Sequence, residues 1–202
     1  MARMDRRPRQ RLDPAERREA ILAAAAGLFG ARAYDEVSIA EVAQVSGASE
    51  ALVFRYFATK ADLYAALVTA AVERLVADQD AALAALPPGV PARDRVSAVA
   101  HAYLDTVARH PARWAEPLRG GREPEAAREV RRTAHEQAVR ALADLLEPRD
   151  SVRHDFAIRG YLGFLDAACL HWVDSGCPQH QRHTLVAAAL GALEGALGDW
   201  DA

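Results

Sequence analysis

Apolar side chains recur at helical spacing along most of the chain, and no stretch carries the alternation that indicates a β-strand. Near the N-terminus, Asp13, Pro14 and Glu16 stand at the N-cap, first and third positions of a helix start. We therefore predict a first helix from Pro14 to about Gly30. Its apolar stripe consists of Ile21, Ala25, Leu28 and Phe29.

Residues 38–60 predict two short helices around a tight turn. Ser38 and Glu41 have the spacing of a capping box, and Gly47 supplies the left-handed position that ends the first of these helices. A second helix begins at Ser49. The first helix is expected to bury Ile39, Val42, Ala43 and Val45. This arrangement is a helix-turn-helix, whose second helix is narrow enough to enter the major groove of DNA.

The rest of the chain continues the helical pattern. Thr59 and Asp62 form a further capping signal, before a helix that is expected to reach about Asp80. The sequence LPPGVP at residues 86–91 breaks it. The later helices are expected at about 92–110, a short one through 114, then 124–146, 151–175 and 180–200. The fold class is therefore all-α.

Composition places the chain among ordinary globular proteins. It has 202 residues, of which 51% are apolar, so it can bury a sizeable core. No apolar run is long enough to cross a bilayer, and an arginine-rich start without an apolar segment is no secretory signal. Two cysteines are too few for a disulfide framework. We expect a soluble cytoplasmic protein with no membrane partner and with reduced thiols.

Charge is concentrated rather than uniformly basic. The net charge is −3, so any affinity for DNA must arise locally. Residues 1–12 form a basic arm directly before the helix-turn-helix, which either enters an adjacent minor groove or remains a solvated tail. Its positive residues are Arg3, Arg6, Arg7, Arg9 and Arg11. Lys60 is the one lysine in the chain.

The strings LFGARAYDEV, SIAEVAQVSGASEALVFRYFATK and ADLYAAL resemble the DNA-binding domain of the TetR/AcrR family of transcriptional regulators. The resemblance runs from about Pro14 to Leu67. It implies a DNA-binding domain at residues 13–60, which includes the helix-turn-helix, and a connecting helix leading into a larger sensing and dimerisation domain at 61–202. It also implies a homodimeric repressor that binds a palindromic operator on double-stranded DNA, is released by a small molecule and uses no cofactor.

The same resemblance assigns DNA contacts by position. It places Ser38, Ser49, Tyr56 and Lys60 at phosphates, and it places base readout on the exposed face of the second short helix. That face carries Glu50, Ala51, Leu52 and Arg55, with Phe54 at a position where the family often has tyrosine. Glu50 either accepts from a cytosine amino group or only complements the helix dipole. The family usually has glycine where Ala33 precedes Tyr34, so this loop is expected to take a different shape.

Glycine is unusually frequent in the last two predicted helices, although mid-helix glycine costs up to about 1 kcal/mol relative to alanine. Close approach between helices compensates for that cost. In the family, these two helices of each subunit build a four-helix dimer interface. The alternative is that the small residues pack within one subunit. The candidate interface residues are Gly160, Gly163, Ala167, Ala188, Gly191, Ala192 and Gly195.

The effector cannot be named from the sequence. Candidate pocket residues are aromatic and histidine side chains on otherwise apolar helix faces: Tyr103, Trp114, His135, Tyr161, Phe164 and Trp172. A metal-sensing regulator is an alternative, because Cys169, His171, Cys177, His180 and His183 cluster in the sequence around the turn between the last two predicted helices. An enzyme is a poor alternative, since no nucleophile motif, phosphate loop or HExxH pattern is present.

Overall fold

The computed structural model describes residues 13–146 and 151–198, and in these ranges the chain forms nine α-helices and no strand, as predicted. The helices are α1 (Pro14–Ala31), α2 (Ile39–Ser46), α3 (Glu50–Tyr56), α4 (Lys60–Ala84), α5 (Ala92–Arg109), α6 (Pro111–Leu118), α7 (Glu125–Leu145), α8 (Val152–Asp174) and α9 (Arg182–Leu197). The predicted basic arm, residues 1–12, lies outside the described residues.

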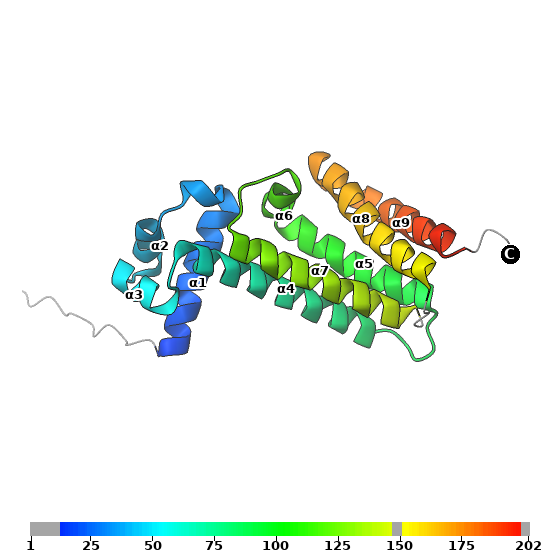
Figure 1. Cartoon of the computed structure of the whole chain (residues 1–202), viewed down its shortest axis with the longest axis horizontal. Coiled ribbons are helices and arrows are strands. Elements are labelled where there is room, and N and C mark those ends of the chain that lie inside the picture. The colour runs from blue at the N-terminus through cyan, green and yellow to red at the C-terminus, as the bar shows by residue number, and fades with distance from the viewer. Residues whose placement is uncertain (1–12, 147–150, 199–202) are drawn as a thin grey trace, which may run out of the picture.

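Helices α1, α2 and α3 form a small unit at one end of the molecule (Figure 1). The predicted start signals are confirmed, because capping boxes form at Asp13–Glu16, Ser38–Glu41 and Thr59–Asp62. Gly47 ends α2 at φ 64°, in the left-handed region that glycine adopts without strain. The unit closes around Ile21, Val42, Val53 and Leu63, each with none of its surface exposed.

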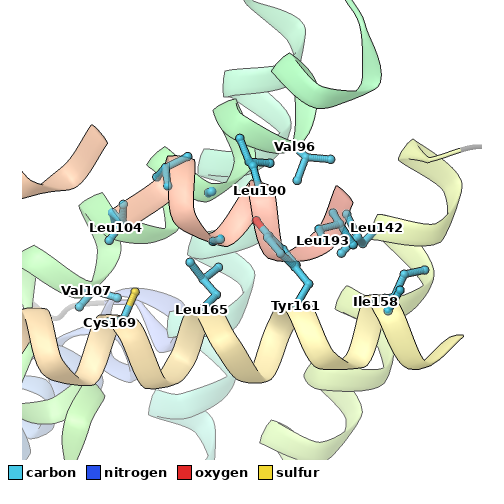
Figure 2. Close-up of a cluster of buried hydrophobic side chains, with 14 of the residues drawn as sticks. Val96, Leu104, Val107, Leu142, Ile158, Tyr161, Leu165, Cys169, Leu190 and Leu193 are labelled. Atoms are coloured by element: carbon cyan, nitrogen blue, oxygen red, sulfur yellow. The ribbon is translucent and has the colours of Figure 1, made fainter. Parts of the chain in front are cut away.

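The remaining helices build a second core. Side chains of α8 point toward α9 and α5, and Figure 2 shows Ile158, Tyr161, Leu165 and Cys169 facing Leu190 and Leu193. These α8 residues recur at three- and four-residue spacing, so they share one face of the helix. The opposite face of α8 is left at the molecular surface.

Helices α4 and α7 join the two units. They lie side by side (Figure 1), and the N-terminal part of α7 contributes Ala127 to the core of the first unit, where it is fully buried. Helix α4 begins at Lys60 and also gives Leu63 and Leu67 to the core of the first unit, so the domain boundary at residue 60 stays a prediction. The second unit therefore reaches directly into the packing of the first.

Three local expectations need correction or refinement. Val45 was predicted to be buried, which is wrong: it is 61% exposed, because the eight-residue α2 turns only Ile39, Val42 and Ala43 inward. Ala33 is extended at φ −60°, so it adopts no left-handed strain. The short helix expected through Trp114 continues to Leu118. No helix in the described ranges is both long and apolar enough to span a membrane.

Candidate nucleic-acid interface and effector site

The exposed face of α3 is set by the two residues that anchor it. Val53 is fully buried and Phe57, directly after the helix, is 5% exposed, so both point into the core of α1, α2 and α4. Residues four apart share a helix face, so the opposite face is turned outward. It carries Glu50, Ala51, Phe54 and Arg55, which are exposed, with Leu52 and Tyr56 partly exposed.

The two serines expected at phosphates serve as helix caps. The Ser49 hydroxyl accepts from the backbone N–H of Leu52 at 3.2 Å. The Ser38 hydroxyl donates to Glu41 at 2.8 Å and accepts from the Glu41 backbone N–H at 3.2 Å. The backbone N–H of Ser38 and then the guanidinium of Arg32 lower the pKa of Glu41 to about 2. These contacts fix how α2 and α3 begin.

Lys60 occupies the first position of α4, on the same unit as α3. Its Nζ lies 4.2 Å from the centroid of the Tyr34 ring, a cation–π contact. Tyr34 in turn meets the ring of Tyr64 edge-on at 5.1 Å. The ammonium is thus held by an aromatic support while its outer side stays partly exposed.

Tyr64 links this aromatic support to the second unit. Its hydroxyl donates to the Glu123 carboxylate at 3.0 Å, and Glu123 is 8% exposed. Arg131, on α7, donates two hydrogen bonds to the same carboxylate, at 2.9 Å and 3.0 Å. Burial, followed by the charge of Glu123, raises the pKa of Tyr64 to about 12. The hydrogen bond from Tyr64 to Glu123 therefore connects α4 with the segment before α7, and Arg131 of α7 pairs with the same buried carboxylate.

The small residues expected at a dimer interface lie on the outer faces of α8 and α9. Gly160, Gly163 and Gly191 are exposed, and a Cβ built on any of them meets no atom within 4 Å. Packing inside this chain therefore does not require glycine at these positions. Ala167, Ala188 and Ala192 are also exposed, and Gly195 is partly exposed. Phe156, at 70% exposure, lies on the outer face of α8.

The six candidate pocket residues fall into different places. Tyr161 and Trp172 are buried in the core between α8 and α9, whereas Phe164 is 39% exposed on the outer side of α8. His135 is exposed on α7. Tyr103 and Trp114 come together, with ring centroids 6.0 Å apart, at the edge of the core.

Asp166, which was not among the predicted pocket residues, joins Tyr103 and Trp114 in one cluster. The Tyr103 hydroxyl donates to the Asp166 carboxylate at 2.5 Å, and the Trp114 indole N–H donates to the Tyr103 oxygen at 2.9 Å. The available signal was a single acidic residue within the apolar run YLGFLDAACL. Separately, an open groove between α4 and α5 is lined by alanines with Asp78, His101, Asp105 and Arg109, and none of the six candidates lines it.

The cysteine and histidine cluster does not assemble. Cys169 is fully buried in the core, while His171, His180 and His183 are exposed. Burial raises the pKa of the Cys169 thiol to about 12. In the described part of the chain, no three His, Cys, Asp or Glu side chains gather in an arrangement that could hold a metal ion. The metal-sensing alternative therefore gains no support from these residues.

Comparison with known proteins identifies the N-terminal unit. Residues 21–67 match the profile described as "Bacterial regulatory proteins, tetR family". That segment contains α2 and α3 and the first part of α4. None of the curated proteins matches the chain.

Solved structures share the whole fold. A tetR-family transcriptional regulator from Streptomyces coelicolor is 24% identical, with a TM-score of 0.78 over 92% of this chain and 82% of that one. A putative transcriptional regulator from Pseudomonas aeruginosa PAO1 is 18% identical, with a TM-score of 0.76 over 93% and 94%. FadR from Bacillus subtilis, solved with stearoyl-CoA, is 15% identical, with a TM-score of 0.62 over 89% and 97%.

Proposed function

We propose that this chain is a homodimeric cytoplasmic repressor of the TetR family, because residues 21–67 match that family's profile and solved TetR-family regulators share its fold. It binds a palindromic operator and leaves that operator when a small-molecule effector binds the second domain. The observation that carries the proposal is the outward face of α3, which is held in place by buried Val53 and Phe57.

DNA recognition divides between positioning and readout in this proposal. Lys60 contacts a phosphate from the first turn of α4, and Ser38, Ser49 and Tyr56 line the backbone path beside α3. Arg55 reads a guanine, since the guanidinium matches its O6 and N7 acceptors. Leu52 and Phe54 offer apolar surface for thymine methyl groups. Glu50 and Ala51 complete the face, with Glu50 either accepting from cytosine or only complementing the dipole of α3.

Dimerisation is part of the proposed mechanism. A single seven-residue recognition helix makes few base contacts, whereas two related by a two-fold axis read half-sites about 34 Å apart, or a multiple of that spacing. The glycine and alanine faces of α8 and α9 supply the interface. At Gly160, Gly163 and Gly191 a Cβ would meet no atom of the same chain within 4 Å, which supports a role between two chains.

Effector release requires that the second domain act on the first. The buried Tyr64–Glu123–Arg131 contact and the insertion of Ala127 supply that link, because a shift of α7 moves α4 with it. A coupling of about 1–3 kcal/mol is enough to change operator occupancy severalfold or more.

Selection of random DNA by the purified protein tests this function. We expect an inverted repeat to be enriched by the wild-type protein. The variant Arg55→Ala should enrich the same repeat with relaxed preference at one base per half-site. Enrichment of no sequence, or of a single asymmetric site, would contradict the proposal. Unaltered selectivity of Arg55→Ala would remove Arg55 from the readout set.

A further inference from the structure

We propose that Arg32 is a positioning residue for DNA binding, which neutralises the Glu41 carboxylate so that a DNA phosphate can approach the start of α2. This inference rests on the proposed function, because it adds a residue to the proposed DNA-binding surface. Arg32 is the residue that ends α1, and it was not among the expected DNA contacts. Its side chain reaches Glu41, nine positions further along the sequence, and so joins the end of α1 to α2.

The two oxygens of the Glu41 carboxylate have different partners. Oε1 accepts from the Arg32 guanidinium at 2.8 Å, whereas Oε2 accepts from the backbone N–H and from the hydroxyl of Ser38, each at 2.8 Å. The Arg32 guanidinium also donates to the backbone carbonyl of Glu36 at 3.4 Å. The carboxylate therefore lies one hydrogen bond away from the serine hydroxyl that is proposed to contact a phosphate.

The capping role of Glu41 does not require an arginine. Glu16 and Asp62 complete the capping boxes at the starts of α1 and α4. Within residues 13–146 and 151–198, neither of these two carboxylates takes part in an ion pair, whereas Glu41 does. The pairing of Glu41 with Arg32 therefore has a reason other than capping.

The charge of Glu41 is unfavourable at a place where a phosphate binds. The Ser38 backbone N–H, followed by the Arg32 guanidinium, lowers the pKa of Glu41 to about 2, so the carboxylate stays ionised near neutral pH. A carboxylate and a phosphate at such short range repel each other. Helix α2 carries no lysine or arginine of its own, so the compensating charge has to come from another element. Arg32 supplies that charge from the end of α1.

The same contacts leave Ser38 able to turn toward DNA. Its hydroxyl has one proton, which it donates to Glu41 in the free protein. When that proton is donated to a phosphate instead, Oε1 of Glu41 keeps the Arg32 guanidinium and Oε2 keeps the Ser38 backbone N–H. The carboxylate then still has two donors, and α2 stays capped. Arg32 thus acts on the phosphate through Glu41 and Ser38.

The test is a set of charge-changing variants of the full-length chain. Anisotropy titrations measure affinity for the duplex recovered by the selection of random DNA. Arg32→Gln leaves the Glu41 charge uncompensated, so affinity should fall about 2- to 30-fold, as for one exposed charge interaction in each of two half-sites. The loss should shrink as the salt concentration rises. Arg32→Lys keeps the charge and should bind more tightly than Arg32→Gln.

Glu41→Gln separates an electrostatic role from a structural one. Glutamine also serves at this position of a capping box, so the variant removes the charge and keeps the cap. Its affinity for the duplex should exceed that of the wild type, because the Arg32 charge is then unopposed. The double variant of Arg32→Gln and Glu41→Gln should bind more tightly than Arg32→Gln alone. A purely structural contact predicts the reverse, since each substitution then only removes support from α2.

The matched control is Arg128→Gln, which removes an arginine from an exposed ion pair with Glu125 on α7 and should leave affinity unchanged. Far-ultraviolet circular dichroism verifies that each variant is folded. If Arg32→Gln does not fold, Glu41→Gln alone decides between the two roles.

Two results would overturn the inference. These are unchanged affinity in folded Arg32→Gln, and affinity in Glu41→Gln that does not exceed that of the wild type. The outcome is separable from that of the proposed function. An enriched inverted repeat with unchanged affinity in Arg32→Gln rejects this inference alone, whereas absence of DNA binding by the wild type rejects the DNA-binding role and this inference with it.

Discussion

In the proposed DNA complex, Lys60 contacts a phosphate, and its surroundings in the free protein favour that role. It is the one lysine of the chain, it begins α4, and its ammonium rests 4.2 Å from the centroid of the Tyr34 ring. The aromatic support restricts the long side chain before DNA arrives, so less conformational freedom is lost when a phosphate binds.

The variant Lys60→Ala should weaken binding to all DNA sequences alike and reduce the slope of log affinity against log salt by about one unit. Anisotropy titrations at several salt concentrations measure both quantities. The matched control is Arg74→Ala, which removes the same charge about 21 Å further along α4 and should leave the slope unchanged. A changed sequence preference in Lys60→Ala would contradict a phosphate-only role.

The buried thiol of Cys169 predicts that the stability of the fold depends on pH. Burial raises the pKa of its thiol from 9 to about 12, so the folded state favours the protonated form. Its contribution to stability is therefore complete below about pH 9 and is lost as the pH rises toward 12. The free energy of unfolding, measured from pH 8 to 11, should fall less steeply for Cys169→Ala than for the wild type. Identical slopes would refute this assignment.

At the scale of elements, the contact between α4 and α7 is the one that joins the two units of the molecule. Glu123 is almost completely buried, and it is neutralised by Arg131 while also accepting from Tyr64. Removing one partner of such a pair costs more than the pair contributes, because a buried charge is left alone. Elsewhere on α7, Arg128 pairs with Glu125 at the surface, where both side chains are more than half exposed.

These two arginines make a matched comparison. Arg131→Met should lower the free energy of unfolding by about 3 kcal/mol, whereas Arg128→Met should change it by less than about 0.5 kcal/mol. Denaturant titrations of both variants measure the difference. Equal effects would show that Glu123 is not dependent on Arg131, and the proposed link between the two domains would lose its main contact.

The elements themselves were largely predictable, because their ends carry local signals. Asp13, Ser38 and Thr59 cap helices where the sequence indicated, and Gly47 ends α2 as expected. The prediction that Val45 is buried was wrong, because apolar character does not say which face of a short helix is covered. Asp166 was missed because its partners come from α5 and α6, and only tertiary packing brings them together. The roles of the remaining site residues stay predictions.

At the scale of the whole molecule, the proposed dimer is built from the outer faces of α8 and α9. Gly160, Gly163 and Gly191 carry the cost of mid-helix glycine, although a Cβ at these positions would meet no atom of the same chain within 4 Å. Phe156 adds exposed apolar surface on α8. Small residues flanked by apolar surface allow two helix pairs to approach closely, which is the geometry a four-helix interface needs.

Replacing a glycine on this face should separate the subunits without unfolding them. Gly191→Leu should shift the protein from dimer to monomer in sedimentation velocity, with its helical content retained, because Gly191 is exposed and a Cβ there meets no atom of its own chain within 4 Å. Gly27→Ala is the control: its Cβ also meets no atom within 4 Å, but it lies on α1. A dimer that persists in Gly191→Leu would place the interface elsewhere.

The central claim is that two copies of α3 read one symmetric DNA site. Sedimentation equilibrium of the protein with its selected operator measures the number of chains per duplex directly. The account predicts two chains on the complete inverted repeat, and much weaker binding to a duplex that contains one half-site. One chain per complete site, bound as tightly as to the half-site, would contradict it.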